Sequence, residues 1–187
     1  MLDMTPPALK TSLLKHLPVS NAQLSLRAMK QADAAAYAAG TMDAAVKQFG
    51  HLPLEHYTPE IVSEMIYGSI ADGLRSGDLA VLTIADTASD RFAGSLVLFD
   101  FTEQDAEIGY WVASDFRGQN IAYKTLMLAA DYARALRLYQ LRARTVTDNP
   151  ASVHVLHKAG FAQTGLPEAE TAPSGKTELI LKFTLQL

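Results

Sequence analysis

The sequence predicts a mixed α/β (α+β) fold, in which a sheet carries helices on its faces. Short segments with alternating or continuous apolar residues recur along most of the chain and are separated by polar turns, as is typical of strands. Longer segments with helical spacing lie between them and have recognisable boundary residues. Together these observations predict about seven strands and about four helices.

The chain begins with an extension, followed by a strand and a helix. Residues 1–20 are expected to form an irregular or short helical extension, and residues 21–187 to form one domain. Residues 22–29 alternate between apolar and polar side chains and predict a strand. Residues 30–40 are rich in alanine and end at Gly40, a residue that favours the end of a helix.

A second helix follows residues 41–57, a mixed segment in which we predict a proline-containing loop and no regular element. The helix is expected to begin after Thr58, whose hydroxyl suits the N-cap, with Pro59 at its first position. Its apolar residues are spaced roughly as in a helix, and Gly77 is expected to end it.

Three strand candidates then follow in a row, at residues 79–85, 92–100 and 106–114. The first two are nearly continuous apolar runs, as expected for strands covered on both faces. A helix that ends at about Leu138 is predicted after them, because apolar residues recur along one of its sides. These residues are Ala122, Leu126, Ala129, Ala133 and Leu136.

The last predicted elements are a strand, a short helix and two further strands. The short helix has Asp148 or Asn149 as its cap, Pro150 at its first position and Gly160 at its end. The strands are expected at residues 139–147, 161–166 and 176–185, with a turn-rich loop that contains Pro173 between the last two.

Composition narrows the range of functions. The chain has 187 residues, of which 49% are hydrophobic and 19% charged, as in ordinary globular domains. Its net charge of -4 and pI of about 5.7 argue against general binding to nucleic acids or membrane surfaces. The absence of cysteine excludes disulfides, thiolate zinc sites and a cysteine nucleophile. No metal site is predicted.

The N-terminal sequence "MLDMTPPALKTSLLKHLPVS" has no charged region followed by an unbroken apolar core, so no signal peptide is predicted. No apolar run approaches the roughly 20 residues that span a bilayer. We therefore expect a cytoplasmic protein without nucleic-acid or membrane partners. These features do not distinguish a monomer from a homodimer, and both are kept as expectations.

Charge is unevenly distributed along the chain. Residues 117–158 contain seven basic and two acidic residues, whereas the remainder contains 9 basic and 18 acidic ones. A solvated helix face with an edge strand is the simpler explanation of the basic segment. A site for a small polyanion is the alternative.

The segment "DFRGQNIAYKTL", residues 115–126, joins a predicted strand to a predicted helix. The N-terminus of a helix leaves several backbone N–H groups unpaired, and these donors and the helix dipole favour an anion. Arg117 adds a charge that can pair with phosphate, Gly118 lets a ligand approach the backbone, and Ala122 keeps the first helical turn clear. An ordinary polar turn before a helix is the alternative.

Four segments together resemble the GNAT superfamily of acetyl-CoA-dependent N-acetyltransferases. They are "LSLRAMKQAD", "EIGYWVASDFRGQNIA", "DNPAS" and "HKAGF", and the resemblance extends over residues 22–185. It is strongest to the branch of ribosomal-protein N-terminal (alanine/serine) acetyltransferases. The resemblance implies the GNAT acyl-CoA N-acyltransferase fold, with a central, twisted, mostly antiparallel sheet. It also implies transfer of acetyl from acetyl-CoA to a primary amine, on a protein N-terminus or a small molecule, by direct attack in a ternary complex.

The resemblance also implies a set of cofactor-binding residues. Family members wrap the cofactor pyrophosphate with the pattern Arg/Gln-x-x-Gly-x-Gly/Ala, and Arg117, Asn120 and Ala122 occupy its defined positions. Asn120 stands where the family usually has glycine, and asparagine is a residue that tolerates positive φ. The implied cofactor-binding residues are Trp111, Val112, Arg117, Gly118, Gln119, Asn120, Ile121, Ala122, Asn149 and Ser152.

By the same resemblance, backbone N–H groups near Trp111 and Val112 polarise the thioester carbonyl, in the manner of an oxyanion hole. Asn149 contacts the cofactor arm, although its role as a helix cap accounts for it without function. Ser152 lies where the leaving thiolate must be protonated or hydrogen-bonded. Asn149 and Ser152 therefore have both a structural and a functional explanation.

The general base is a carboxylate, a histidine or a water relay. Glu107, on the cofactor strand, is one candidate. Glu168 or Glu170, expected in a loop that faces the acceptor, is another, and Glu170 corresponds best to the base proposed in the ribosomal-protein branch. The catalytic candidates are therefore Ser152, Glu107 and Glu170.

Residues 41–76 and 164–175 are expected to line the acceptor side, and their acidic and histidine content suits a cationic or amine-bearing acceptor. The alternative function is a non-catalytic acyl-CoA-binding or protein-interaction domain on the same scaffold, which Asn120 in place of glycine would indicate.

Overall fold

The computed structural model describes residues 12–171 and 177–187 of the chain. Eight strands form one sheet in the order β1-β2-β3-β4-β5-β6-β8-β7. Neighbouring strands are antiparallel except for β5 and β6, which are parallel. The first part of the predicted extension, residues 1–11, and the predicted loop around Pro173, residues 172–176, lie outside the described residues.

The elements have the following bounds. The strands are β1 (Val19–Ser20), β2 (Leu24–Ala28), β3 (Ala80–Asp86), β4 (Phe92–Phe99), β5 (Asp105–Val112), β6 (Gln140–Val146), β7 (Ala162–Thr171) and β8 (Thr177–Gln186). The α-helices are α1 (Ala34–Thr41), α2 (Ala44–Phe49), α3 (Pro59–Met65), α4 (Ala71–Ser76), α5 (Ile121–Ala135) and α6 (Pro150–Lys158). The remaining helical turns are η1 (Leu13–His16), η2 (Gln31–Asp33), η3 (Ile66–Ile70) and η4 (Ser114–Phe116).

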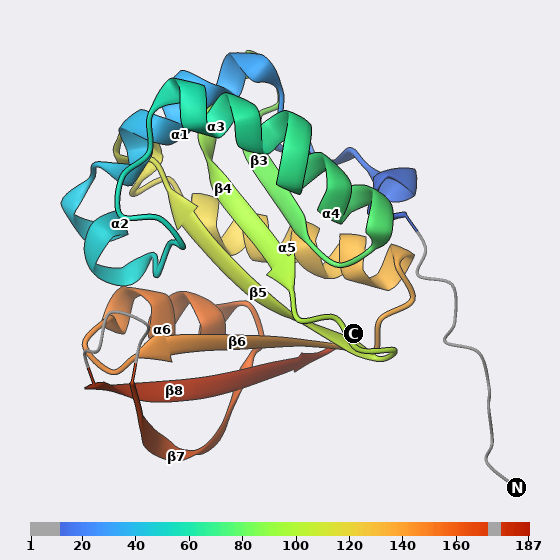
Figure 1. Cartoon of the computed structure of the whole chain (residues 1–187). Coiled ribbons are helices and arrows are strands. Elements are labelled where there is room, and N and C mark those ends of the chain that lie inside the picture. The colour runs from blue at the N-terminus through green and yellow to red at the C-terminus, as the bar shows by residue number, and fades with distance from the viewer. Residues whose placement is uncertain (1–11, 172–176) are drawn as a thin grey trace, which may run out of the picture.

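Helices cover the sheet on both faces. Figure 1 shows α1, α3 and α4 on one face of the strands β3 to β5 and α5 on the other. Helix α1 packs on β4 and α3, whereas α5 packs on β2, β5 and β6. Between these layers lie fully buried side chains such as Leu26, Leu82, Leu96 and Leu126. The predicted mixed α/β fold with a mostly antiparallel sheet is confirmed.

Two helix starts follow the predicted capping residues. The hydroxyl of Thr58 accepts a hydrogen bond from the N–H of Ile61, and α3 begins at the next residue, a proline. The side chain of Asn149 accepts from the N–H of Ser152, and α6 also begins at a proline. Asn149, and not Asp148, is therefore the cap of α6.

The predicted helix after Thr58 is interrupted in the structure. A π-helical turn, η3, separates α3 from α4, and Gly68 within it has φ -100° and ψ -107°, outside the helical region. Glycine accepts such angles because it has no Cβ. The structure also contains α2 in the segment where no helix is predicted. Asp43 caps this helix, because its side chain accepts from the N–H groups of Ala45 and Val46.

Strand β7 is longer than predicted. The sequence indicates a strand that ends at residue 166, whereas β7 continues to Thr171 and includes Pro167. Proline is tolerated there because β7 is an edge strand, and the register of its pairing with β8 shifts between Thr164 and Glu168. No helix in the described part of the chain is long and apolar enough to cross a membrane.

Candidate functional site

Strands β5 and β6 separate partway along their length. They pair in parallel as far as Ile108 and Ala143. Beyond these residues, β5 pairs with β4 up to Val112, while β6 pairs with β8 up to Val146. Figure 1 shows the two strands close together at one end and apart at the other. We call the opening between these two diverging segments the split.

Along β5, the backbone N–H and C=O groups of every second residue point toward the split. The N–H of Ala113 donates to a β4 carbonyl, so the residue two positions earlier, Trp111, also faces β4. Tyr110 and Val112 then direct their backbone groups toward the split. In agreement, the carbonyl of Val112 accepts a hydrogen bond from Nε of Arg117 at 3.1 Å.

The indole of Trp111 is buried on the α1 side of the sheet. Its ring centroid lies 5.4 Å from that of Tyr37 and 5.6 Å from that of Phe92. A Cβ on Gly40 of α1 would lie 2.5 Å from the indole, so glycine is needed for this close approach. Of the two predicted residues on this strand, Val112 therefore faces the split, while Trp111 belongs to the core.

The connection between β5 and α5 contains two residues in the left-handed conformation. Gly118 has a φ of 75° and Asn120 a φ of 62°. The positive φ that asparagine was expected to tolerate is therefore present at position 120. A Cβ on Gly118 would meet no atom within 4 Å, so the backbone there is open to a ligand. Since α5 begins at Ile121, the N–H groups of its first turn adjoin this loop.

The other predicted residues of this loop have simple environments. The side-chain amide of Gln119 donates to the carbonyl of Asp115 at 3.2 Å. Ile121 is buried in the core, and Ala122 is half-buried on the first turn of α5. The side chains of Gln119 and Ile121 are therefore engaged within the protein, and the backbone groups of these three residues are what the loop could offer to a ligand.

Two lysines that the sequence prediction did not assign lie beside the loop. Nζ of Lys158, at the end of α6, donates to Oδ1 of Asn120 at 2.9 Å and lies 5.0 Å from the centroid of the Tyr123 ring. Nζ of Lys124 donates to the carbonyl of Gln119 at 3.3 Å. The basic segment noted in the sequence was the available signal for both lysines.

Arg117 connects the loop to the other side of the molecule. Its Nη2 lies 2.7 Å from Oδ1 of Asp43 and its Nη1 lies 3.2 Å from Oδ2, so the two groups are joined at two points. The hydrogen bonds from Arg117 are the main reason why the pKa of Asp43 lies below its ordinary value. Because Asp43 also caps α2, the ion pair fixes the loop against the start of that helix.

The first turn of α6 borders the split. Asn149 accepts from the N–H of Ser152 at 3.2 Å, and Oγ of Ser152 lies 3.5 Å from Oη of Tyr110. Burial raises the pKa of the Tyr110 hydroxyl, and the contact with Ser152 acts in the opposite direction. The structure therefore brings a second hydroxyl, which the sequence prediction did not nominate, next to Ser152.

Glu107 is buried at the closed end of the split. Oε1 accepts from Nε of Arg144 at 2.7 Å, and Oε2 accepts from Nη1 of Arg142 at 3.3 Å. Arg142 additionally contacts Asp100 and Asp105. Both oxygens of this predicted base are therefore already hydrogen-bonded to arginines.

Glu168 and Glu170 lie on strand β7, so their predicted location in a loop is wrong. The error arises because β7 continues through Pro167 at the edge of the sheet. Glu170 contacts Arg144 at 3.1 Å and Lys182 at 3.2 Å, and Glu168 also contacts Lys182. Arg144 thus connects both predicted bases, Glu107 and Glu170, in one charged network.

This charged network extends across strands β5 to β8. Its described members are Asp100, Asp105, Glu107, Glu168, Glu170, Arg142, Arg144 and Lys182. The five carboxylates outnumber the three cations, so the network carries a surplus of negative charge. Such a surplus favours the approach of a cationic group.

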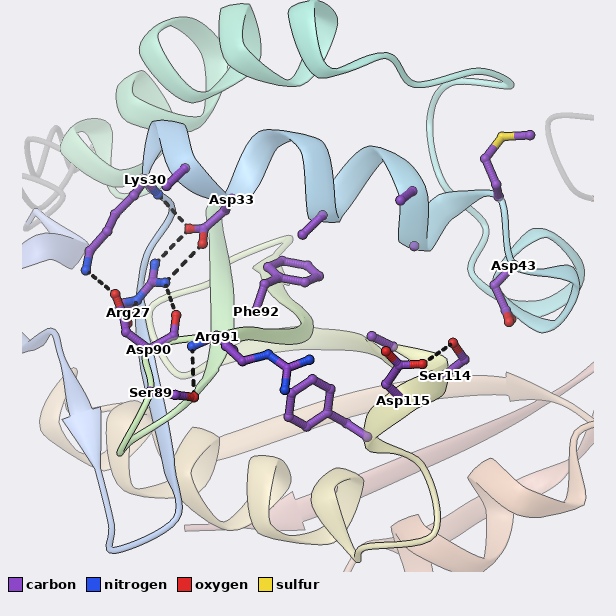
Figure 2. Close-up of a pocket in the computed structure, with 17 residues that line it drawn as sticks. Arg27, Lys30, Asp33, Asp43, Ser89, Asp90, Arg91, Phe92, Ser114 and Asp115 are labelled. Atoms are coloured by element: carbon purple, nitrogen blue, oxygen red, sulfur yellow. Dashed lines mark hydrogen bonds and ion pairs between the residues drawn. The ribbon is translucent and has the colours of Figure 1, made fainter.

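A cavity of about 790 Å³ lies away from the split, between α1, the turn that joins β3 to β4, and η4. Figure 2 shows Arg91 in its wall. The guanidinium carbon of Arg91 lies 5.3 Å from the centroid of the Phe116 ring. The described residues that line it include none from β6, β8 or α6. The cavity therefore lies outside the split but adjoins the predicted sites, because Asp115 and Phe116 belong to the segment before α5, and Met42 and Asp43 belong to the expected acceptor side.

Within residues 12–171 and 177–187, no group of three or more histidine, aspartate or glutamate side chains is arranged to hold a metal ion.

Known proteins share both the sequence pattern and this architecture. The sequence model of the family described as "Acetyltransferase (GNAT) domain" matches residues 23–162. A curated relative, YjcK of Bacillus subtilis (strain 168), whose name describes an N-acetyltransferase, is 31% identical over 99 residues. The match covers 51% of this chain and 55% of the relative, so the chain spans about half of that protein's length.

Solved structures with the same fold include two acetyltransferases of named substrates. RimL, described as a ribosomal L7/L12 alpha-N-protein acetyltransferase, has a TM-score of 0.74 and 25% identity, with coverage of 91% of this chain and 93% of RimL. A spermidine N-acetyltransferase from Vibrio cholerae, in complex with CoA and spermine, has a TM-score of 0.74 and 19% identity, with coverage of 89% and 96%. The second likeness shows the fold alone.

Proposed function

The chain belongs to the GNAT acetyltransferase family, and on that premise we propose that it transfers an acetyl group from acetyl-CoA to a primary amine. The observation that carries this proposal is the split between β5 and β6. A strand edge left without its partner binds an extended chain through backbone hydrogen bonds. The pantetheine arm of acetyl-CoA contains two amides, and it would take the place of the missing strand partner along Tyr110 and Val112.

The loop before α5 supports the diphosphate end of the same ligand. The left-handed conformation of Gly118 and Asn120 and the N-terminus of α5 favour an anion there. Lys124 and Lys158 lie at the edge of the loop and supply positive charge. Arg117 is already paired with Asp43, so we assign it a lesser share of phosphate binding than the family pattern implies.

In the proposed reaction the amine nitrogen attacks the thioester carbonyl directly, with acceptor and acetyl-CoA bound together. The new C–N bond forms while the carbonyl electrons move to oxygen, and a backbone N–H of β5 at the split stabilises that charge. The carbonyl then re-forms, the C–S bond breaks, and its electron pair moves to sulfur. Ser152 lies beside the split and would protonate or hydrogen-bond this sulfur.

The amine must lose a proton to become an amide, and we assign this proton to Glu170 through a water molecule. Glu170 is partly exposed, whereas Glu107 is buried between Arg142 and Arg144. Glu107 would then serve to hold Arg144 beside Glu170.

The acceptor is an amine on a protein N-terminus or on a small molecule. The surplus of carboxylates in the network across β5 to β8 supports a cationic acceptor, because an ammonium group is attracted before it loses its proton. RimL and the spermidine acetyltransferase represent these two acceptor classes among proteins of this fold.

The test is thiol release from acetyl-CoA with a thiol-reactive dye, in the presence of N-terminal peptides and polyamines. The chain contains no cysteine, so free CoA is the only thiol detected. We expect release that depends on one acceptor class. Measurable CoA affinity without turnover of any acceptor would favour the alternative, a non-catalytic acyl-CoA-binding domain. Absence of CoA affinity would contradict both functions.

A further inference from the structure

Two hydroxyl groups meet across the split. Tyr110 lies on the part of β5 beyond its last pairing with β6, and Ser152 lies in the first turn of α6. Their oxygens are 3.5 Å apart, which is the upper limit of a hydrogen bond. Hydrogen bonds between catalytic groups are often long without substrate and shorten in the reactive complex.

Ser152 is positioned by its backbone and not by its hydroxyl. Its N–H donates to the side chain of Asn149, which fixes the residue at the start of α6. The side-chain hydroxyl remains free to rotate unless another group holds it. Tyr110 is the side chain that contacts this hydroxyl in the described part of the protein, and its ring packs against the hydrophobic core.

We propose that Tyr110 is a positioning residue that acts through Ser152. The phenol of Tyr110 donates a hydrogen bond to Oγ of Ser152, and this leaves the proton of Ser152 directed at the sulfur of CoA. The inference rests on the proposed acetyl transfer and adds a residue to it. Asn149, Ser152 and Tyr110 would together form a support that extends from the cap of α6 to β5.

When the C–S bond breaks, its electron pair moves to sulfur, and the hydroxyl of Ser152, held by Tyr110, hydrogen-bonds the resulting thiolate. The proton that the amine nitrogen releases passes through water to Glu170 and from there to solvent. The CoA thiolate takes one proton from solvent, so Ser152 and Tyr110 keep their own protons. The net reaction consumes the amine and acetyl-CoA and yields the amide and CoA thiol. Burial raises the pKa of Tyr110, so the phenol carries its proton at neutral pH.

The decisive experiment titrates the thiol of CoA bound to the full chain, by its thiolate absorbance, with desulfo-CoA complexes as the blank. Since the chain has no cysteine, CoA supplies the only thiolate, and the desulfo-CoA blank removes the absorbance of ionising tyrosines. The variants are Tyr110→Phe, Ser152→Ala and the double variant. Tyr110→Phe keeps the ring and removes only the hydroxyl, and Tyr139→Phe, at an exposed tyrosine outside the predicted sites, is the matched control.

A hydroxyl directed at sulfur stabilises the thiolate, so we expect the pKa of the bound thiol to rise by about half a pH unit in Tyr110→Phe, as for the loss of one hydrogen bond. Ser152→Ala should raise the pKa of the bound thiol at least as much. The pKa in the double variant should equal that in Ser152→Ala. Tyr139→Phe should titrate like the original protein.

Turnover adds a second readout. We expect kcat to fall about fivefold to tenfold in Tyr110→Phe with KM for acetyl-CoA unchanged. The double variant should be no slower than Ser152→Ala, because Tyr110 acts only through Ser152.

The inference would be overturned if the thiol of CoA bound to Tyr110→Phe had the same pKa as in the original protein. It would also be overturned if the reductions in kcat caused by Tyr110→Phe and Ser152→Ala multiplied in the double variant. Neither result would affect the proposed function, since CoA would still bind. Loss of CoA affinity in the unsubstituted protein would instead contradict the proposed function itself.

Discussion

The guanidinium of Arg117 and the carboxylate of Asp43 form a two-point ion pair, with distances of 2.7 and 3.2 Å, between residues 74 positions apart in the chain. The pair joins the loop before α5 to the cap of α2. An arginine in this position of the family pattern is expected to serve the cofactor, yet here its charge is balanced by a protein carboxylate. Cofactor affinity should therefore depend on both residues.

Replacement of Asp43 by asparagine should tighten CoA binding about threefold, because it removes a negative charge near the proposed phosphate site and releases Arg117. Asparagine is as good a helix cap as aspartate, so α2 should remain intact. Arg117→Gln should weaken binding about tenfold, through the loss of a charge-assisted phosphate contact. Isothermal titration at fixed ionic strength measures both effects.

The double variant tests whether the two residues act together. If the gain from Asp43→Asn comes through Arg117, most of it should disappear in the Arg117→Gln background. Weaker CoA binding in Asp43→Asn alone would show that the ion pair supports the cofactor loop and does not compete with phosphate.

Position 120 should tolerate glycine better than alanine. Asn120 has a φ of 62°, and a left-handed backbone costs a residue with an ordinary Cβ about 1–2 kcal/mol. Asn120→Ala should therefore lower the free energy of unfolding by about 1 kcal/mol, whereas Asn120→Gly should change it by less than about 0.5 kcal/mol. Urea denaturation checks both variants, and equal losses would contradict the role assigned to this backbone angle.

Asp33 should be a major contributor to stability. It is buried and accepts hydrogen bonds from both terminal nitrogens of the buried Arg27, from the N–H of Lys30 and from the hydroxyl of Thr83 (Figure 2 shows Arg27, Lys30 and Asp33). Asp33→Asn leaves the guanidinium without its buried partner, and should lower the free energy of unfolding by about 3–5 kcal/mol. Denaturant unfolding measures this loss.

Asp90 provides the matched control, since it contacts the same Arg27 at 2.6 Å but is half exposed. Water solvates an exposed carboxylate in both the folded and the unfolded chain, so Asp90→Asn should leave the unfolding midpoint close to that of the unsubstituted protein. A loss as large as that of Asp33→Asn would show that burial does not distinguish the two carboxylates.

Asp33 should also make stability depend on pH. Burial by itself raises the pKa of Asp33, but the hydrogen bonds from Arg27, Lys30 and Thr83 more than offset it, so its pKa lies below the ordinary value. The stability that ionised Asp33 contributes is therefore fully present above the pKa of an aspartate in the unfolded chain, about 3.9. This stability is lost as pH falls through the lower pKa of Asp33 in the folded protein. Between about pH 5 and pH 2 the unsubstituted protein should lose more stability than Asp33→Asn. Parallel curves for the two proteins would contradict this role.

The two glutamates that contact Arg144 should differ in their effects. Glu170→Gln should lower kcat about 100-fold and remove the acidic limb of the pH–rate profile, as expected for a general base, with little effect on stability. Glu107→Gln should lower the free energy of unfolding by about 3 kcal/mol, because two arginines lose a buried anion, and kcat should change much less. The opposite pattern would make Glu107 the base.

The elements of the fold were largely predictable, because the signals that specify them lie in adjacent residues. Apolar alternation predicted the strands, and the caps Thr58 and Asn149 are where they were expected. Two differences from the predicted elements have identifiable causes. The π turn at Gly68 is allowed because glycine has no Cβ. The extension of β7 through Pro167 is allowed because β7 lies at the edge of the sheet, which the apolar pattern does not reveal.

For the site, adjacent residues were enough to predict the loop before α5 and an asparagine that tolerates positive φ at position 120. The chain order alone did not reveal that the backbone groups of Tyr110 and Val112, and not of Trp111, face the split, or that Arg117 pairs with Asp43. These relationships depend on strand register, on where β5 and β6 stop pairing, and on contacts between distant segments. Helix caps and apolar periods act over a few residues, whereas an ion pair across 74 positions exists only once the sheet has formed.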